Sequence, residues 1–160
     1  MGNSFPFTPA NVRALHAARE SSFPHMSRAD SAVWREFLRG SGVEFSRLDY
    51  DVSLGAGGLG EYDGDSYSAE QWAALRQKRI DVVGTTASGV WVIEVKPVAN
   101  MAALGQVLTY GHLWDETIGA GRKCRRVVVG GEIDVDAPGV YQRYGVMLWR
   151  AASGDVARVV

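Results

Sequence analysis

Two runs of β-branched residues, separated by a short stretch of small residues, constrain this chain more than any other feature of its sequence. The first run covers Arg79 to Val83, and the second covers Val90 to Lys96, directly before Pro97. The residues between them, Gly84 to Gly89, are mostly glycine, threonine and serine. Two such runs around a turn-forming stretch are typical of an antiparallel hairpin, and proline is typical of a strand end. We therefore predict a β-hairpin whose second strand ends at Pro97.

Helices and further strands are predicted on both sides of this hairpin. Capping residues and apolar spacing predict helices over Thr8 to Glu20, Ser27 to Gly40, Ala69 to Gln77 and Asn100 to Trp114, with a helical turn over Pro138 to Tyr144. Alternating or β-branched runs predict strands over Asp49 to Leu54, Arg126 to Val129 and Val146 to Trp149, with a last short strand after Ser153-Gly154. Gly55 to Ser68 is expected to be a loop. The order predicts a mixed α/β fold, a central sheet flanked by helices, with its first three strands antiparallel.

The length of the chain limits its organisation. At 160 residues it can form one compact domain, so we predict a single domain over 1–160, with helices in 1–45, the core in 49–129 and strands in 130–160. One cysteine, Cys124, excludes an internal disulfide. The first residues lack the pattern of a secretory signal, and no apolar run is long enough to cross a membrane. We expect a cytoplasmic protein or, for a phage-encoded chain, a virion-associated one.

The net charge of −1 argues against a surface that is basic throughout, which many duplex-binding proteins have. Positive charge is nevertheless clustered at two places in the sequence. The clusters are Arg76, Lys78 and Arg79, and then Arg122, Lys123, Arg125 and Arg126. Either cluster is compatible with local contacts to phosphates or with ordinary solvated surface.

Three charged residues of the hairpin are candidates for chemistry. Because side chains alternate along a strand, Glu94 and Lys96 share a face, while Ile93 and Val95 point into the core. A turn centred near Thr86 and Ala87 places Asp81 opposite Val92 and diagonal to Glu94, at a Cα separation of about 7–8 Å. Two carboxylates at that separation can bind one Mg²⁺ ion. A register shift of one residue would move Asp81 to the other face.

Such a set of residues fits the hydrolysis of a phosphodiester. A metal ion held by two carboxylates neutralises charge on the phosphate and lowers the pKa of its bound water. Lys96, beside the metal, can orient that water and stabilise the developing charge. On the following helix, Gln106 and Tyr110 are four residues apart and share a face, from which both can hydrogen-bond a phosphate. The alternatives are a solvated ion-pair patch for the charged residues and plain packing for the helix pair.

At this point the sequence resembles a known family, the PD-(D/E)xK nuclease superfamily. The resemblance is carried by Arg79-Ile-Asp81, Val92-Ile-Glu94-Val-Lys96-Pro97 and Gln106-Val-Leu-Thr-Tyr110. The last motif, Q-x-x-x-Y, is similar to that of the RecB-type and Cas4-like branch. The resemblance implies a restriction-endonuclease-like αβββαβ core and a Mg²⁺ or Mn²⁺ ion bound by Asp81, Glu94 and the main-chain carbonyl of Val95. It also implies that Lys96 is catalytic, supported by Gln106 and Tyr110.

The chain departs from this family in two respects. Many members supply an acidic residue from the first helix, and neither candidate here fits, since Glu36 lies away from the apolar face and Glu20 is distant in sequence. The cysteine cluster that binds iron and sulfur in some relatives is absent. The resemblance implies a metal-dependent DNA nuclease that acts on duplex, single strands or ends.

Two alternatives stay open. One is a non-catalytic protein with a nuclease fold, which serves phage or virion assembly or binds nucleic acid within a larger complex. The other is a subunit interface of a homo-oligomer, with Lys96 paired across it.

Overall fold

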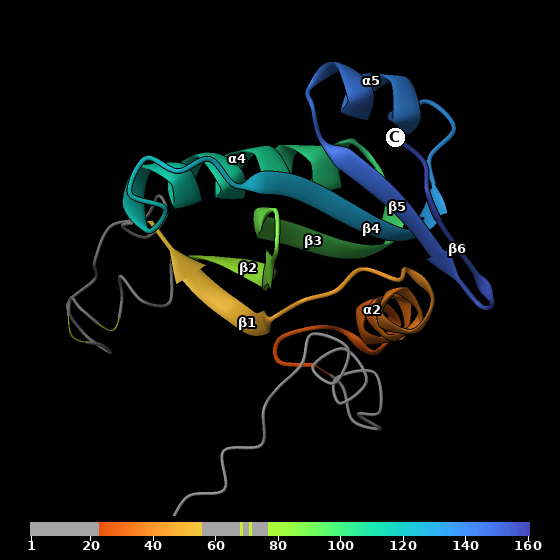
Figure 1. Ribbon diagram of the computed structural model, residues 1–160, viewed down its shortest axis with the longest axis horizontal. Coiled ribbons are helices and arrows are strands. Elements are labelled where there is room, and N and C mark those ends of the chain that lie inside the picture. Colours follow the sequence, from red (N-terminus) through yellow and green to blue (C-terminus); the bar gives the residue numbers. More distant parts are fainter. Residues whose placement is uncertain (1–22, 56–67, 69–70, 72–76) are drawn as a thin grey trace, which may run out of the picture.

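A six-stranded mixed sheet forms the centre of the protein in the computed structural model, which describes residues 23–55, 68, 71 and 77–160 (Figure 1). The strands lie side by side in sequence order. They are β1 (Arg47–Leu54), β2 (Lys78–Thr86), β3 (Gly89–Ala99), β4 (Arg125–Ile133), β5 (Met147–Ala152) and β6 (Asp155–Arg158). Strands β1 to β3 are antiparallel, β3 to β5 are parallel, and β6 is antiparallel to β5.

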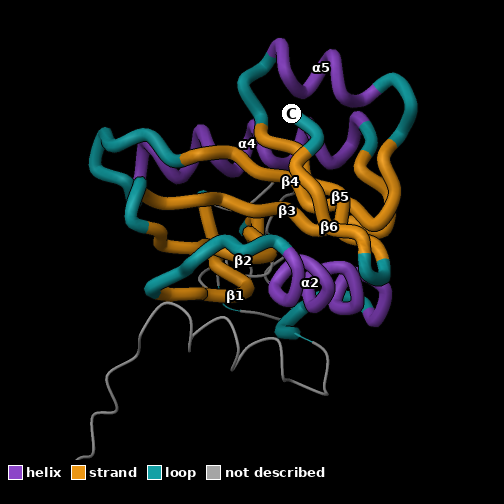
Figure 2. The backbone as a smooth tube through the Cα atoms, turned by 45° about the vertical axis from the view of Figure 1, so that its right-hand side comes forward, coloured by secondary structure: helices purple, strands orange, loops and turns teal. Residues whose placement is uncertain are grey.

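Helices cover both faces of this sheet. Helix α2 (Arg28–Gly40) lies against one face, and α4 (Met101–Thr117) and α5 (Ala137–Arg143) lie on the other (Figures 1 and 2). The order α2, β1, β2, β3, α4, β4 is the expected αβββαβ order, and the predicted class, a mixed α/β fold with a central sheet flanked by helices, is confirmed. No helix among the described residues is long and apolar enough to span a membrane.

The core consists of two apolar clusters, one on each face of the sheet. The predicted apolar side of α2 is buried, and its Trp34 and Phe37 pack with Ile93 and Val95 of β3. On the opposite face, Val92 of β3 packs with residues of α4 and α5. Strand β3 is therefore buried on both faces, which explains its almost continuous apolar sequence.

Side-chain caps define where both long helices begin. Ser27 accepts from the backbone N–H of Asp30, and the Asp30 carboxylate accepts from the backbone N–H of Ser27, which forms a capping box for α2. Asn100 accepts from the N–H groups of Ala102 and Ala103 at the start of α4. Both starts agree with the prediction, whereas α4 continues beyond the expected end at Trp114 to Thr117.

The turn of the central hairpin is shorter than expected. Thr86 pairs with Gly89, so only Ala87 and Ser88 form the turn, and the predicted turn over 84–89 is wrong. Gly84 lies instead inside β2, where an added Cβ would approach the Phe45 ring to 2.5 Å. Glycine here permits close packing of an aromatic ring on the strand rather than a turn.

Strand β3 also continues through Pro97, contrary to the expected end. The Val95 N–H points toward β2, and residue 97 faces the same way because it is two residues further along the strand. Pairing between β2 and β3 has already ended there, at Val82 and Ile93. Proline lacks an N–H, but on this side no strand formed by the described residues needs one. On the other side, pairing with β4 continues to Ala99.

The other predicted elements differ from the structure mainly in their bounds. The strands expected at 49–54, 126–129 and 146–149 are present as β1, β4 and β5. Strands β1 and β4 are longer than expected, and β5 begins and ends later than expected. The helical turn expected over 138–144 is α5, and the turn at Ser153-Gly154 leads into β6. The helix predicted over 8–20 lies outside the described residues, as do most of the loop over 55–68 and the helix over 69–77.

Candidate active site

The register of the central hairpin places Asp81 beside Glu94. Val83 pairs with Val92 and Val82 pairs with Ile93, the last pair of the two strands, so the same register continued by one residue places Asp81 opposite Glu94. The prediction that Asp81 faces Val92 is wrong by two residues because the turn is centred one residue further along. A shift of two residues by itself leaves each residue on the face that was predicted for it.

A kink in β1 and β2 directs Asp81 between the strands. Asp51 of β1 has a φ of 53°, in the left-handed region, and its carboxylate is 2.6 Å from the Arg79 guanidinium and 3.1 Å from Nε2 of His25. Ile80 packs with the cluster on the α4 face, although Val82 packs with the cluster on the α2 face. Alternation is therefore interrupted at Asp81, whose Oδ2 accepts the Val95 N–H at 2.9 Å in place of a ladder bond.

Glu94 is the most deeply buried charged residue among those described. Its side chain is only 1% exposed, and its Oε1 lies 2.7 Å from Nζ of Lys96. Within the described residues its other oxygen, Oε2, is buried without a hydrogen-bond partner. Burial and the neighbouring charge of Asp81 raise the pKa of Glu94 to about 7, although Lys96 acts in the opposite direction. A solvated patch of surface ion pairs, one alternative for these residues, is therefore wrong for Glu94.

Asp81 and Lys96 are perturbed by the same surroundings. Burial raises the pKa of Asp81, and the Val95 N–H and the Lys96 charge lower it by less. Burial lowers the pKa of Lys96, but its hydrogen bond to Glu94 and the charge of that carboxylate together raise it above the ordinary value. Lys96 thus stays a cation at neutral pH. Its ion-pair partner is Glu94 of the same chain, rather than a residue across a subunit interface.

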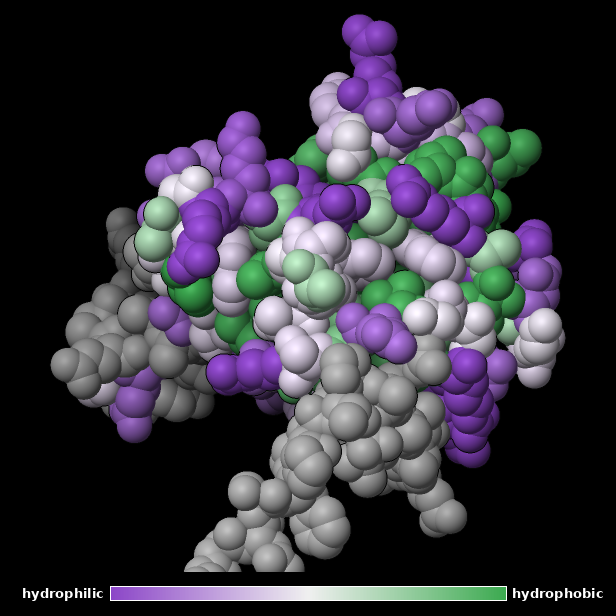
Figure 3. Space-filling view, in the orientation of Figure 1, coloured by the Kyte–Doolittle hydropathy of each residue, from purple (hydrophilic) through white to green (hydrophobic). Residues whose placement is uncertain are grey.

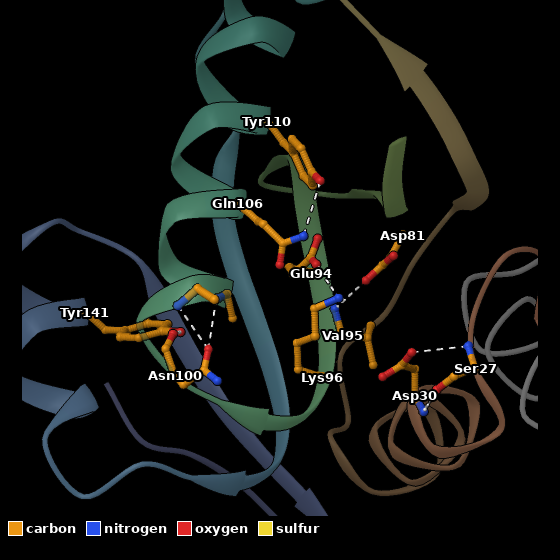
Figure 4. A network of polar contacts seen from close by, with 12 residues as sticks. Ser27, Asp30, Asp81, Glu94, Val95, Lys96, Asn100, Gln106, Tyr110 and Tyr141 are labelled. Carbon is orange, nitrogen blue, oxygen red and sulfur yellow. Dashed lines mark hydrogen bonds and ion pairs between the residues drawn. The ribbon is translucent and has the colours of Figure 1, made fainter. Parts of the chain in front are cut away.

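Asp30 of α2 is a further acidic residue of this site, which the sequence reasoning missed. Its Oδ2 accepts from Ser27, whereas its Oδ1 is buried without a partner among the described residues. Its charge raises the pKa values of both Asp81 and Glu94, and its carboxylate faces the segment of Val95 and Lys96 (Figure 4). The capping box predicts an acid at the start of the helix, but it does not indicate that this acid lies beside β3.

Helix α4 brings Gln106 and Tyr110 over Glu94 (Figure 4). The two side chains lie on one face of the helix, with Nε2 of Gln106 3.5 Å from the Tyr110 hydroxyl. Burial and the charge of Glu94 raise the pKa of Tyr110. All five side chains predicted as catalytic are thus brought together by β2, β3 and α4. Glu36, by contrast, pairs with Arg39 on the surface of α2.

The oxygen atoms of this site suit a hard cation. Glu94 Oε2 and Asp30 Oδ1 are unpaired carboxylate oxygens, which Mg²⁺ or Mn²⁺ accept as ligands. In a strand the C=O of Val95 points to the same edge as its N–H, and therefore toward Asp81. No group of three or more His, Cys, Asp or Glu side chains is arranged to hold a metal ion in the described part of the chain. A cation here would therefore be bound by the carboxylates of Asp81 and Glu94 and by the main-chain oxygen of Val95.

Comparisons with known proteins add one structural likeness. No protein-family model and no curated protein sequence matches the chain. A solved structure described as "Structure of EndoMS-dsDNA2 complex" is similar at 13% sequence identity and a TM-score of 0.47. The match covers 84% of this chain and 51% of the other, so the chain spans about half the length of that protein.

Proposed function

We propose that this protein is a metal-dependent nuclease of PD-(D/E)xK type that hydrolyses phosphodiester bonds of DNA. The proposal rests on the burial of Glu94. Its carboxylate lies beside Asp81, and one of its oxygens has no hydrogen-bond partner among the described residues. Burying a charge without full compensation costs several kcal/mol. A bound cation would compensate that cost. The αβββαβ order and the grouping of Lys96, Gln106 and Tyr110 around the carboxylates support the same function.

Asp81, Glu94 and the Val95 carbonyl are the groups that would hold Mg²⁺ or Mn²⁺. Such an ion supplies charge neutralisation at the scissile phosphate and a water of lowered pKa. Asp30 adds negative charge at the same place, as its effect on the pKa values of Asp81 and Glu94 indicates. The protein thus concentrates carboxylate oxygens at one place, and a bound cation would offset their mutual repulsion.

Lys96 is proposed to orient the attacking water and to stabilise charge on the phosphate. Its side chain is 30% exposed, so the ammonium lies at the border between the buried Glu94 and solvent. The raised pKa keeps it protonated, with N–H groups available to a water or a phosphate oxygen. The raised pKa of Tyr110 likewise keeps its hydroxyl protonated. This hydroxyl and the Gln106 amide can each donate a hydrogen bond to a phosphate oxygen.

Cleavage assays with substituted proteins test this function. Wild-type protein is incubated with linear duplex, circular duplex and single-stranded DNA, with Mg²⁺, Mn²⁺ or EDTA. Lys96→Ala and Asp81→Asn are expected to lower cleavage by about 100- to 1000-fold, the effect of losing one charge-stabilising group. Lys78→Ala, which removes an exposed lysine of β2, is the matched control and should cut like wild type. Equal cutting by all four proteins would refute the proposed site.

Metal binding provides a test that does not depend on cleavage. Calorimetric titration with Mn²⁺ is expected to show one site in wild type and a much weaker one in Asp81→Asn. If folded wild type neither binds Mn²⁺ nor cuts any of the three DNAs, the function is not that of a metal-dependent nuclease.

A further inference from the structure

A hollow of about 340 Å³ lies between the end of α4 and the start of β3. Its walls combine an aromatic ring, small or aliphatic residues and two cations: Val90, Trp114, Ile118, Gly119, Arg122 and Lys123. Trp114 packs partly against the core on the α4 face. None of the described residues that line this hollow is a carboxylate.

The two cations of the hollow, Arg122 and Lys123, are exposed. Within the part of the chain that the structure describes, neither Arg122 nor Lys123 has an acidic partner. The nearby Arg126 differs, since its guanidinium pairs with Asp115 at 2.9 Å. Hydrophilic residues gather at this end of the molecule, at the upper left over the connection from α4 to β4 (Figure 3). The hollow thus combines one aromatic ring with two cations that have no acidic partner among the described residues.

This hollow lies on the same side of α4 as the candidate active site. Gln106, Tyr110 and Trp114 follow one another at intervals of four residues, so they form one face of the helix. At a rise of 1.5 Å per residue, Trp114 lies about 6 Å beyond Tyr110 along the helix axis. Val90 and Glu94 likewise share one face of β3, about 13 Å apart. A strand of nucleic acid that leaves the site along α4 would reach the hollow within a few nucleotides.

We propose that this hollow binds a nucleotide of single-stranded DNA, with its base stacked on Trp114 and its phosphate on Arg122 and Lys123. An aromatic platform beside unpaired cations is the chemistry with which proteins hold single strands, because every base has a stacking face and every nucleotide carries a phosphate. A base within a duplex is already stacked and paired. The hollow therefore selects a single strand or a frayed end. This inference rests on the proposed function, in which DNA is the substrate.

Fluorescence anisotropy with a labelled single-stranded oligonucleotide, measured in EDTA over a range of salt concentrations, tests the proposal without cleavage. Trp114→Leu keeps apolar bulk but loses the stacking face, and is expected to weaken binding by about 5- to 100-fold. The double variant Arg122→Ala/Lys123→Ala is expected to reduce the salt dependence of log K by about 0.7 to 1.4. Arg143→Ala, which removes an exposed arginine of α5, is the control, for which binding should change less than about 2-fold.

Three results would overturn the proposal. The first is a double variant that binds and responds to salt like Arg143→Ala. The second is a folded Trp114→Leu that binds like wild type, which would leave only a phosphate contact without a base site. The third is wild type that binds duplex more tightly than single strands.

Failure of the proposed function is recognised separately. A small chromogenic phosphodiester has no second phosphate to reach the hollow. Its hydrolysis should therefore need Lys96 but neither Trp114 nor the two cations.

Discussion

Replacing Glu94 by glutamine should stabilise the metal-free protein at alkaline pH. The buried carboxylate has a pKa of about 7, against an ordinary value of 4.5, so the folded state binds its proton more tightly than the unfolded state does. The contribution of this group to stability is therefore complete below about pH 4.5 and is lost as the pH rises through about 7. At roughly 1.4 kcal/mol per pKa unit, the loss amounts to roughly 3 kcal/mol above the upper value.

Glu94→Gln removes this cost but also removes the carboxylate that pairs with Lys96. The ammonium of Lys96 is 30% exposed, so water can take over part of that interaction. We therefore expect a net gain of about 1–2 kcal/mol near pH 8.5 and no gain near pH 5. The neutral amide should also abolish most of the stabilisation that Mg²⁺ or Mn²⁺ gives to wild type, since ligands stabilise only the state that binds them.

Urea unfolding at several pH values, with and without metal, measures both effects. Glu116→Gln, which alters an exposed carboxylate of α4, is the control and should change stability by less than about 0.5 kcal/mol. If Glu94→Gln follows the wild-type pH dependence in EDTA, Glu94 is not held as a buried carboxylate of raised pKa. If it also gains as much from Mn²⁺ as wild type does, the proposed metal site is wrong.

Two further substitutions test the site and its support. Asp30→Asn should weaken Mn²⁺ binding by about 10-fold, because it removes a charge that acts on Asp81 and Glu94, while an amide can keep the cap and hold the loss of stability below about 1 kcal/mol. Calorimetry beside Glu36→Gln on the same helix checks this, and equal affinities would exclude Asp30 from the site. Gly84→Ala should destabilise by about 1–3 kcal/mol in urea unfolding, because the new Cβ would clash with the buried Phe45 ring. Gly139→Ala in α5, where an added Cβ has open space, should instead stabilise slightly, and a neutral Gly84→Ala would contradict the packing argument.

The parts of the fold that the sequence predicted well depend on local signals. Ser27 and Asn100 cap their helices through bonds to residues two or three positions away, and such bonds follow directly from the sequence. The hairpin turn lies one residue later than the sequence predicts, because several small residues in a row can each form a turn. The continuation of β3 through Pro97 could not be predicted from the sequence. It depends on the sheet, in which β3 pairs at this point with β4 but no longer with β2.

The residues of the candidate site also differ in whether local sequence or tertiary packing determines their position. Glu94 and Lys96 share a face of β3, and Gln106 and Tyr110 share a face of α4, which follows β3 directly after Asn100, so spacing predicts each pair and the packing of α4 on β3 joins them. The Tyr141 hydroxyl donates to the Asn100 carbonyl at 2.7 Å and helps to hold that junction.

Asp81 and Asp30 come from two other elements, and only the packing of β2 and α2 around β3 brings them close. The sequence suggests Asp81 through the alternation of faces along the hairpin. The structure interrupts this alternation at Asp81, and the carboxylate reaches the site through its bond to the Val95 N–H. No comparable rule links Asp30 to β3, because α2 meets the sheet only through side chains such as Trp34 and Phe37. The residue that pattern reasoning missed is therefore the one whose place depends on tertiary packing alone.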